Sequence, residues 1–175
     1  MIRRTVLTAV GEDRSGLVEE VSEFLFERGC SIEDSRMANL HGQFAMAMLV
    51  AGPEEAIERI SAEVDALSAG TGIHARLTPV SADTTPTAPR VPCRFAGSGL
   101  DQPGLVHRVA EVFRGFDANI ETMETTLGAA PITGAPLFEM TAVVAVPASV
   151  SIQELRDELG RVCDAINVDW ELAEL

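Results

Sequence analysis

The stretch Gly11-Glu12-Asp13-Arg14-Ser15-Gly16-Leu17-Val18 occurs a second time as Gly99-Leu100-Asp101-Gln102-Pro103-Gly104-Leu105-Val106. Gly, Asp, Gly, Leu and Val stand in register, with the second copy 88 residues after the first. The register continues, because Ile32-Glu33 aligns with Ile120-Glu121 at the same offset. Self-similarity at a fixed spacing indicates repeated structural units. The chain is therefore expected to contain two copies of one domain.

The two copies differ in one hairpin and are joined by a distinctive segment. Phe44 aligns with Phe138 at an offset of 94, so the second copy carries six extra residues, which fall among the loop-forming residues 127–136. Residues 79–92 are rich in Pro and Thr and lack apolar periodicity, as linkers do. We predict a first domain over residues 1–79, a linker over 80–91 and a second domain over 92–175.

Within the first copy, residues 5–10 are β-branched and apolar and end at Gly11, which favours a strand. A helix is expected to follow and to end at Gly29. Its apolar stripe comprises Leu17, Val18, Val21, Phe24 and Leu25. Residues 31–40 and 43–51 predict two strands around the tight turn His41-Gly42, in which the glycine supplies a positive φ.

The remainder of the copy predicts a second helix and a closing strand. Pro53 is expected to open the helix, and Gly70 and Gly72 to end it. Residues 72–78 alternate with period two and predict an edge strand. The expected apolar stripes of the remaining helices are Ile57, Ile60, Val64 and Leu67 in the first copy, and Leu105, Val106, Val109, Val112 and Phe113, then Ile152, Leu155, Leu159 and Val162, in the second.

The order strand, helix, strand, strand, helix, strand is the βαββαβ pattern of the ferredoxin-like fold. The predicted class is therefore α+β, with two domains that each have an antiparallel four-stranded sheet and two helices on one face. Each unit has only about 80 residues and leaves a sheet face or edge without cover. Pairing of the two copies is expected to supply that cover.

Composition narrows the function. The 175 residues carry a formal net charge of −14 with a sequence pI of about 4.5, which disfavours binding to a phosphate backbone. The N-terminal apolar segment is too short for a signal sequence, and no run reaches transmembrane length. Three widely spaced cysteines, Cys30, Cys93 and Cys163, indicate a reduced, cytoplasmic protein with buried thiols, and neither a metal nor a cofactor is expected.

Each Gly-x-Asp-x-x-Gly-Leu-Val loop leads directly into a helix, so it exposes unpaired amides at the positive end of the helix dipole. Such a loop could hold a carboxylate while its aspartate holds an ammonium group, and an amino acid carries both. The alternative is structural. In that interpretation Asp13 and Asp101 cap the helices, while Gly16 and Gly104 permit close packing of helix and strand.

The stretch 11–18, followed by Gly29-Cys30-Ser31-Ile32-Glu33-Asp34-Ser35-Arg36-Met37, the hairpin and the Pro53 helix, resembles the glycine cleavage system transcriptional repressor family. The domains of that family are ACT domains, and the resemblance covers nearly the whole chain. It implies a small regulatory protein that senses an amino acid such as glycine. It also implies control of a transcriptional activator by protein contact, without direct binding of nucleic acid, in a possible homodimer.

In ligand-binding ACT pairs the pocket is shared, with the strand–helix loop of one domain facing the start of the second strand of the other. Carried onto this chain, the resemblance implies two pockets. The first joins Asp13, Gly16 and Leu17 to Asn119 and Ile120, and the second joins Asp101, Gly104 and Leu105 to Ser31 and Ile32. An asparagine amide both donates and accepts, so Asn119 could recognise an amino-acid head group; alternatively it stabilises the turn before the strand.

Two residues depart from the family pattern, because Ser15 stands where proline is usual and Ser31 stands where asparagine is typical. Three other function classes compete with sensing. An enzyme would need His41 to meet Asp13 or Cys30, and no catalytic motif is present. An RNA-binding sheet would need strand aromatics on a basic surface. A ligand-free scaffold would act only through protein contacts, for example at the edge strand 72–78.

Overall fold

The computed structural model describes residues 1–80, 88–129 and 134–175 and divides into two compact units, Met1–Thr84 and Thr85–Leu175. The first unit contains, in order, β1 (Ile2–Glu12), α1 (Leu17–Glu27), β2 (Ser31–Leu40), β3 (Gln43–Pro53), α2 (Glu54–Thr71) and β4 (His74–Pro79). The second contains β5 (Arg90–Leu100), α3 (Leu105–Gly115), β6 (Asn119–Ala129), β7 (Pro136–Pro147), α4 (Ile152–Ala165) and β8 (Val168–Glu174).

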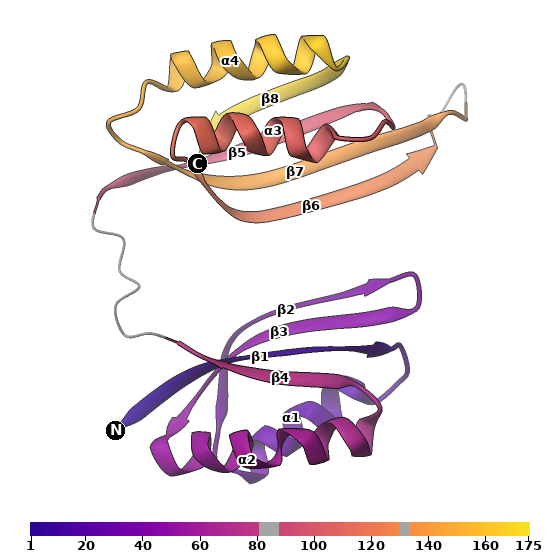
Figure 1. The fold of residues 1–175 in the computed structure, drawn as a ribbon, viewed down its shortest axis with the longest axis vertical. Helices are drawn as coiled ribbons and strands as arrows, with labels where there is room; N and C mark the ends of the chain where they lie inside the picture. The colour runs from indigo at the N-terminus through magenta and orange to yellow at the C-terminus, as the bar shows by residue number, and fades with distance from the viewer. Residues whose placement is uncertain (81–87, 130–133) are drawn as a thin grey trace. The chain divides into compact units, whose positions relative to one another are not determined.

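Each unit holds an antiparallel four-stranded sheet, with strand order β2-β3-β1-β4 in the first and β6-β7-β5-β8 in the second. Both helices of a unit lie on the same face of its sheet (Figure 1). The α+β, ferredoxin-like prediction is confirmed for both copies. The other face of each sheet, called here the open face, carries the alternate strand positions.

The cores follow from this two-layer arrangement, because successive side chains of a strand point to opposite faces. In the first unit, Leu7 and Ala9 of β1 and Met48 of β3 are buried against the helices. In the second unit, Phe95 of β5 packs edge-on against Phe113 of α3, with ring centroids 5.6 Å apart. Each core is a separate hydrophobic cluster drawn from one unit.

Both first helices begin at a glycine in the left-handed region. Gly16 has φ 94° and Gly104 has φ 95°, and among the described residues no side chain caps either helix. A Cβ built on Gly104 would meet no described atom within 4 Å, so close packing does not explain that glycine. The structural alternative for the loops is therefore wrong in both parts. These glycines permit the backbone conformation, and the aspartates do not cap.

Both first helices also end in the same way. After α1, Gly29 N–H donates to Phe26 and Cys30 N–H donates to Leu25, which is the paired arrangement of a Schellman motif. The expected stop at Gly29 is confirmed. At the equivalent position after α3 stands Asp117, with a positive φ of 52° and its carboxylate 3.0 Å from the Arg90 guanidinium.

Several local expectations need correction. Val18 and Val106 are 44% and 38% exposed, because each lies beside the buried stripe and not within it. Gly70 lies inside α2, which continues to Thr71 and is followed by Gly72 at φ 78°.

Strand limits also differ from expectation. β1 is longer than residues 5–10, and Pro53 is the last residue of β3 and precedes the helix. In the second hairpin, β6 continues to Ala129 and β7 begins at Pro136, while residues 130–133 lie outside the described residues. The predicted linker likewise falls largely outside them, since residues 81–87 are not described and β5 begins at Arg90.

Candidate functional site

In the first unit, Asp13 is tied to the β2–β3 hairpin. Its backbone N–H donates to the Gly42 carbonyl at 2.8 Å, and its carboxylate accepts from the Asn39 side-chain amide at 2.5 Å. Asn39 Oδ1 in turn accepts from Gly42 N–H at 3.1 Å. The turn has φ values of 53° at His41 and 81° at Gly42, as a type I′ turn requires. Asp13 is thus engaged within its own unit.

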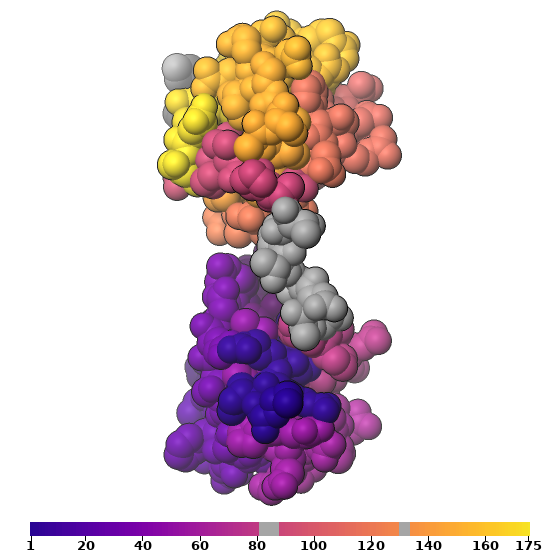
Figure 2. Space-filling model, turned by 90° about the vertical axis from the view of Figure 1, so that its left-hand side faces the viewer, coloured from indigo at the N-terminus to yellow at the C-terminus, as the bar shows by residue number. Residues whose placement is uncertain are grey.

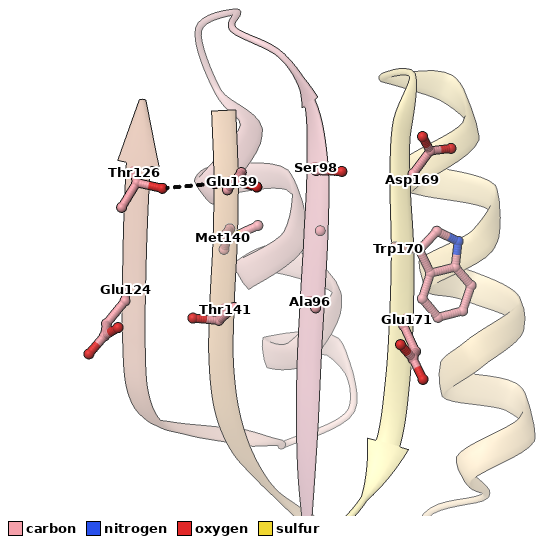
Figure 3. A pocket seen from close by; sticks show the side chains of 11 residues that line it. Ala96, Ser98, Glu124, Thr126, Glu139, Met140, Thr141, Asp169, Trp170 and Glu171 are labelled. Atoms are coloured by element: carbon pink, nitrogen blue, oxygen red, sulfur yellow. Dashed lines mark hydrogen bonds between the residues drawn. The ribbon is translucent and has the colours of Figure 1, made fainter. Parts of the chain in front are cut away.

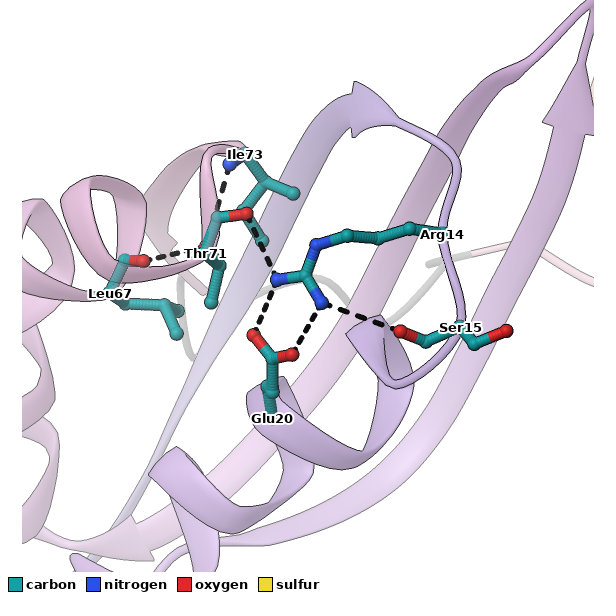
Figure 4. A network of polar contacts seen from close by, with 6 residues as sticks. All are labelled: Arg14, Ser15, Glu20, Leu67, Thr71 and Ile73. Carbon is teal, nitrogen blue, oxygen red and sulfur yellow. Dashed lines mark hydrogen bonds and ion pairs between the residues drawn. The ribbon is translucent and has the colours of Figure 1, made fainter.

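Arg14 joins the same loop to the end of α2 (Figure 4). Its guanidinium donates to both carboxylate oxygens of Glu20, at 2.5 and 2.7 Å, and to the Thr71 carbonyl at 3.1 Å. The hydrogen bond from Arg14 lowers the pKa of Glu20, although both side chains are partly exposed to solvent. The last carbonyls of a helix lack partners within it, so Arg14 supplies a donor where α2 needs one.

The second unit repeats this contact with a neutral side chain. Gln102, which aligns with Arg14, donates through Nε2 to the Ile166 carbonyl at 2.7 Å, just past the end of α4. Asp101 keeps the backbone contact, because its N–H donates to the Pro136 carbonyl at 3.1 Å. Among the described residues, however, no side chain hydrogen-bonds the Asp101 carboxylate. Leu127 stands where the first copy has Asn39.

The two loops also differ in charge. The first turn of α1 contains Glu19 and Glu20, whereas that of α3 contains no acid over the described residues and is followed by Arg108. Arg108 occupies the position that aligns with Glu20. An anion is favoured at a helix N-terminus by the dipole and is disfavoured there by nearby carboxylates. The second loop therefore offers a ligand carboxylate more favourable surroundings than the first loop does.

Within each unit the structure brings some of the predicted site residues together. Asp13, Gly16 and Leu17 line one hollow of about 310 Å³ with Phe44. Asn119 and Ile120 line another, of about 590 Å³, next to the Arg90–Asp117 ion pair.

The other candidates lie at equivalent places. Ser31 begins β2, and its hydroxyl donates to the Ala51 carbonyl at 3.3 Å. Ile32 follows it and is 39% exposed. Asp101 and Gly104 are exposed, while Leu105 is buried. The pairing of a loop from one unit with a strand from the other stays a prediction.

Sequence reasoning missed Asn39, Arg14 and Gln102. Their partners are distant in sequence: Thr71 lies 57 residues from Arg14, and Ile166 lies 64 residues from Gln102. One signal was available, since Arg14 and Gln102 align in the repeat and both carry side-chain N–H donors. Asn39, just before His41-Gly42, is also a residue type that stabilises turns.

The open face of the second sheet carries a shallow acidic hollow of about 490 Å³ (Figure 3). Glu124, Glu139, Asp169 and Glu171 line it, and Thr126 Oγ1 donates to Glu139 at 3.4 Å. Over residues 1–80, 88–129 and 134–175, no group of His, Cys, Asp or Glu side chains is placed to hold a metal ion. The carboxylates make this face unfavourable for phosphate groups.

The RNA-binding alternative also lacks its stacking platform. The strand aromatics Phe44, Phe95, Phe138 and Trp170 stand at register positions of the helix-covered face and pack in or against the cores. Among the described residues, neither open face presents an aromatic side chain. Stacking of bases on strand aromatics is the basis of recognition by such sheets, so the geometry disfavours this class.

The enzymatic alternatives fail on distance and ionisation. Cys30 precedes β2 and His41 follows it, so ten strand residues, or about 33 Å, separate them. All three cysteines are buried, as expected, and none is in a disulfide. Burial raises the pKa of Cys30 and Cys93 and raises that of Cys163 to about 11, so the unreactive thiol is favoured. The Asp13 carboxylate accepts from Asn39, and among the described residues it makes no hydrogen bond or ion pair with His41.

Comparison with known proteins agrees with the fold. Residues 3–78 match a family model described as the ACT domain. The glycine cleavage system transcriptional repressor of Escherichia coli (strain K12) is 26% identical over 167 residues, which are 95% of this chain and 87% of the relative. The first unit thus matches the ACT domain, and nearly the whole chain is similar to the glycine cleavage system transcriptional repressor. The predicted resemblance is thereby confirmed.

Solved structures extend the match to the second unit. The chain superposes with a TM-score of 0.82 on an unknown protein from Galdieria sulphuraria. The two are 30% identical, and the match covers 100% of this chain and 99% of the other. A structure provisionally assigned as a glycine cleavage system transcriptional repressor gives a TM-score of 0.73 at 22% identity, with 100% of this chain and 98% of the other covered. The latter likeness concerns the fold.

Similarity to a transcriptional repressor over 95% of the chain supports a regulatory role, and it agrees with the prediction that the chain is not an enzyme. Over the described residues, no helix is long and apolar enough to cross a membrane.

Proposed function

We propose that this protein senses a small, glycine-like amino acid and controls a transcriptional activator by protein contact in the cytoplasm. The observation that supports sensing most strongly is the duplicated loop. In both copies a left-handed glycine opens a helix that no described side chain caps, so the first helical amides are left for a ligand carboxylate. The acidic composition supports control through protein contact over binding to DNA.

The proposed pockets are those implied by the family: Asp13, Gly16 and Leu17 with Asn119 and Ile120, and Asp101, Gly104 and Leu105 with Ser31 and Ile32. We further propose that the second loop binds the carboxylate more tightly. Its helix begins without acids, and the Asp101 carboxylate makes no side-chain hydrogen bond among the described residues, so it remains available to an ammonium group. Asp13 would first have to lose its hydrogen bond with Asn39 before it could bind an ammonium group.

Titration calorimetry of the full chain with glycine, and with a panel of other amino acids, tests the sensing proposal. We expect heat with a small amino acid, a loss of about tenfold or more in affinity for Asp101→Ala, and a smaller loss for Asp13→Ala. These losses correspond to removal of one charge-assisted hydrogen bond. Asp157→Ala is the matched control, because Asp157 is an exposed carboxylate on α4.

Asn119→Ala tests whether a strand of one unit completes the pocket of the other. A loss of affinity in Asn119→Ala, with unchanged stability, would support the shared pocket. Equal binding in Asn119→Ala and the unaltered protein would remove Asn119 from the site. Absence of heat and of any thermal shift with every amino acid would reject sensing altogether.

A ligand-free scaffold is the second candidate, and the Asp13–Asn39 hydrogen bond favours it for the first loop. In that case one loop would be closed by its own hairpin and would act only as structure. Asn39→Ala distinguishes the two functions. It should create or strengthen amino-acid binding at the first loop if that loop is a latent sensor, and it should leave binding unchanged if the loop is a scaffold.

A further inference from the structure

The internal repeat allows the edge strands β4 and β8 to be compared position by position. In the second unit Phe95 pairs with Leu172 and Gly97 with Trp170. In the first unit Leu7 pairs with Leu77 and Ala9 with Ala75, at the aligned positions of β1. Ala75 therefore stands where the second unit has its tryptophan, the only one in the chain.

The helices align through the loop contacts just described, since Arg14 reaches Thr71 and Gln102 reaches Ile166. When Thr71 is aligned with Ile166, the same offset of 95 residues aligns three residues of α2 with three residues of α4. The pairs are Ser61 with Arg156, Val64 with Leu159, and Asp65 with Gly160.

In the second unit the space between α4 and the edge strand is filled by its own side chains. The Trp170 ring extends from β8 toward α4 (Figure 3), and it lies 3.4 Å from the place that a Cβ on Gly160 would take. Arg156 extends over the same region and donates to the Leu172 carbonyl at 2.8 Å. Beneath them Leu159 and Leu172 are 0% and 4% exposed.

In the first unit the same space is a hollow of about 930 Å³. Ala75 stands in place of Trp170, and Ser61 stands in place of Arg156. The apolar side chains that form the floor of the hollow are therefore not covered. Val64 and Leu77, which align with the two buried leucines, are only half-buried. The start of the chain borders this hollow, and its indigo atoms lie at the surface of the first unit (Figure 2).

We propose that this hollow, lined by Ile57, Val64, Ala75 and Leu77, binds an aromatic side chain that a partner protein presents beside a basic residue. The aromatic ring would take the place of Trp170, and the basic group that of Arg156. The charge on the helical rim is complementary, because Glu58 and Asp65 line it and make no hydrogen bond or ion pair among the described residues. Three arginines line the strand side of the hollow: Arg3 and Arg4 are paired with Glu54 and Glu33, and Arg76 is exposed at the alternate position between Ala75 and Leu77.

A segment of a partner fits this place better than a free metabolite. The hollow is open along β4, which is an edge strand paired only with β1, so its outer backbone groups can pair with a docked chain. Ligand pockets for free molecules normally enclose most of the ligand. The hollow shares no residue with the loop candidates, so this inference is independent of amino-acid sensing.

The test uses the full chain, methyl NMR and capped tripeptides at up to millimolar concentration. Tryptophan between two lysines should shift the methyl signals of Ile57, Val64 and Leu77. Tryptophan between two glutamates should bind about tenfold more weakly, and alanine between two lysines should leave the methyls unshifted. N-acetyl-tryptophanamide should also bind at least tenfold more weakly than the lysine peptide.

Two variants separate binding from stability. Asp65→Gly combined with Ala75→Trp copies the second unit, should fill the hollow and should abolish the shifts. Asp65→Lys changes only an exposed helix position and should weaken the lysine peptide by several-fold. Trp170→Ala is the reverse construction, and it should create new peptide-dependent shifts at Leu159 and Leu172.

Each contrary outcome overturns a part of the proposal. Unshifted floor methyls with the lysine–tryptophan peptide would reject the site. Equal binding of the alanine peptide would show that charge alone attracts it, and equal binding by N-acetyl-tryptophanamide would replace the partner segment with a small aromatic ligand. Undiminished binding to a folded Asp65→Gly, Ala75→Trp protein would place the peptide elsewhere.

Discussion

Gly104 and Gly115 stand at opposite ends of α3 and are expected to respond oppositely to the same substitution. A Cβ on either would meet no described atom within 4 Å, so packing does not distinguish them. Gly104 has φ 95°, which costs an L-residue about 1 kcal/mol. Gly104→Ala should therefore lower the free energy of unfolding by about that amount. Gly115→Ala should raise it by about 0.5 kcal/mol, because alanine favours a helix.

Urea unfolding followed by the fluorescence of Trp170 measures both changes in the same unit. The pair is its own control, since both substitutions add one methyl group to α3. Destabilisation by both would mean that the helix end, and not the left-handed backbone, governs the effect.

The cysteines make a second prediction at the residue scale. The chain has no lysine and no tyrosine, so its three thiols are the side chains that titrate between pH 9 and pH 11. Burial raises their pKa in the folded state, to about 11 for Cys163, so the folded protein holds protons that the unfolded chain has released. The contribution of these thiols to the free energy of unfolding is therefore fully present below about pH 9, and it is lost as the pH rises toward 11.

The slope of the free energy of unfolding against pH measures this effect directly. One thiol that is protonated only in the folded state contributes about 1.4 kcal/mol per pH unit. We expect the free energy of unfolding to fall across this range and Cys163→Ala to reduce the slope, whatever its effect on stability at pH 8. A pH-independent free energy of unfolding between pH 9 and pH 11 would show that the thiols ionise normally in the fold.

At the scale of elements, Arg14 couples a loop to a helix end. Arg14→Ala removes the donor to the Thr71 carbonyl, whereas Arg14→Gln keeps one, as Gln102 does in the second unit. Hydrogen exchange of the amides of Gly72 and Ile73 should become several-fold faster in Arg14→Ala, because opening of the helix end costs less. Arg14→Gln should restore most of the protection.

The comparison between the two variants isolates the hydrogen bond from the charge pair, since both variants lose the ion pair with Glu20. If they exchange at the same rate, the Glu20 pair holds the loop and the carbonyl contact is incidental. The amides after α4 serve as an internal reference, because Gln102 is unchanged in both.

At the scale of the whole molecule, two separate clusters form the cores, and each draws its residues from one unit. Ile60 of α2 and Leu155 of α4 are both fully buried. Truncation of either to alanine should cost about 2 to 5 kcal/mol in its own unit. Leu155→Ala should lower the urea midpoint seen by Trp170 fluorescence, whereas Ile60→Ala should lower a midpoint seen by far-ultraviolet circular dichroism and leave the fluorescence midpoint unchanged.

An equal shift of the fluorescence midpoint by both variants would contradict independent cores. In that case the two units unfold as one cooperative body. Leu7→Ala, on β1 of the first unit, repeats the test at a strand position.

The sequence alone determined the repeat, the order of elements and the position of both loops. These features depend on local patterns: the 88-residue offset, apolar stripes at helical spacing and glycine at turns. Gly16 and Gly104 show the limit of such patterns. Their place at the start of a helix was predictable, but the positive φ that requires them was seen only in the structure.

The tertiary structure decided which of those residues remain available to a partner. The Asn39 amide donates to the Asp13 carboxylate, and Arg14 joins its loop to a helix end 57 residues away. Trp170 fills a space in the second unit that stays open in the first. The physical reason is that a pattern along the chain reports which face of an element is buried. It does not report which side chain from a distant element fills the space above that face.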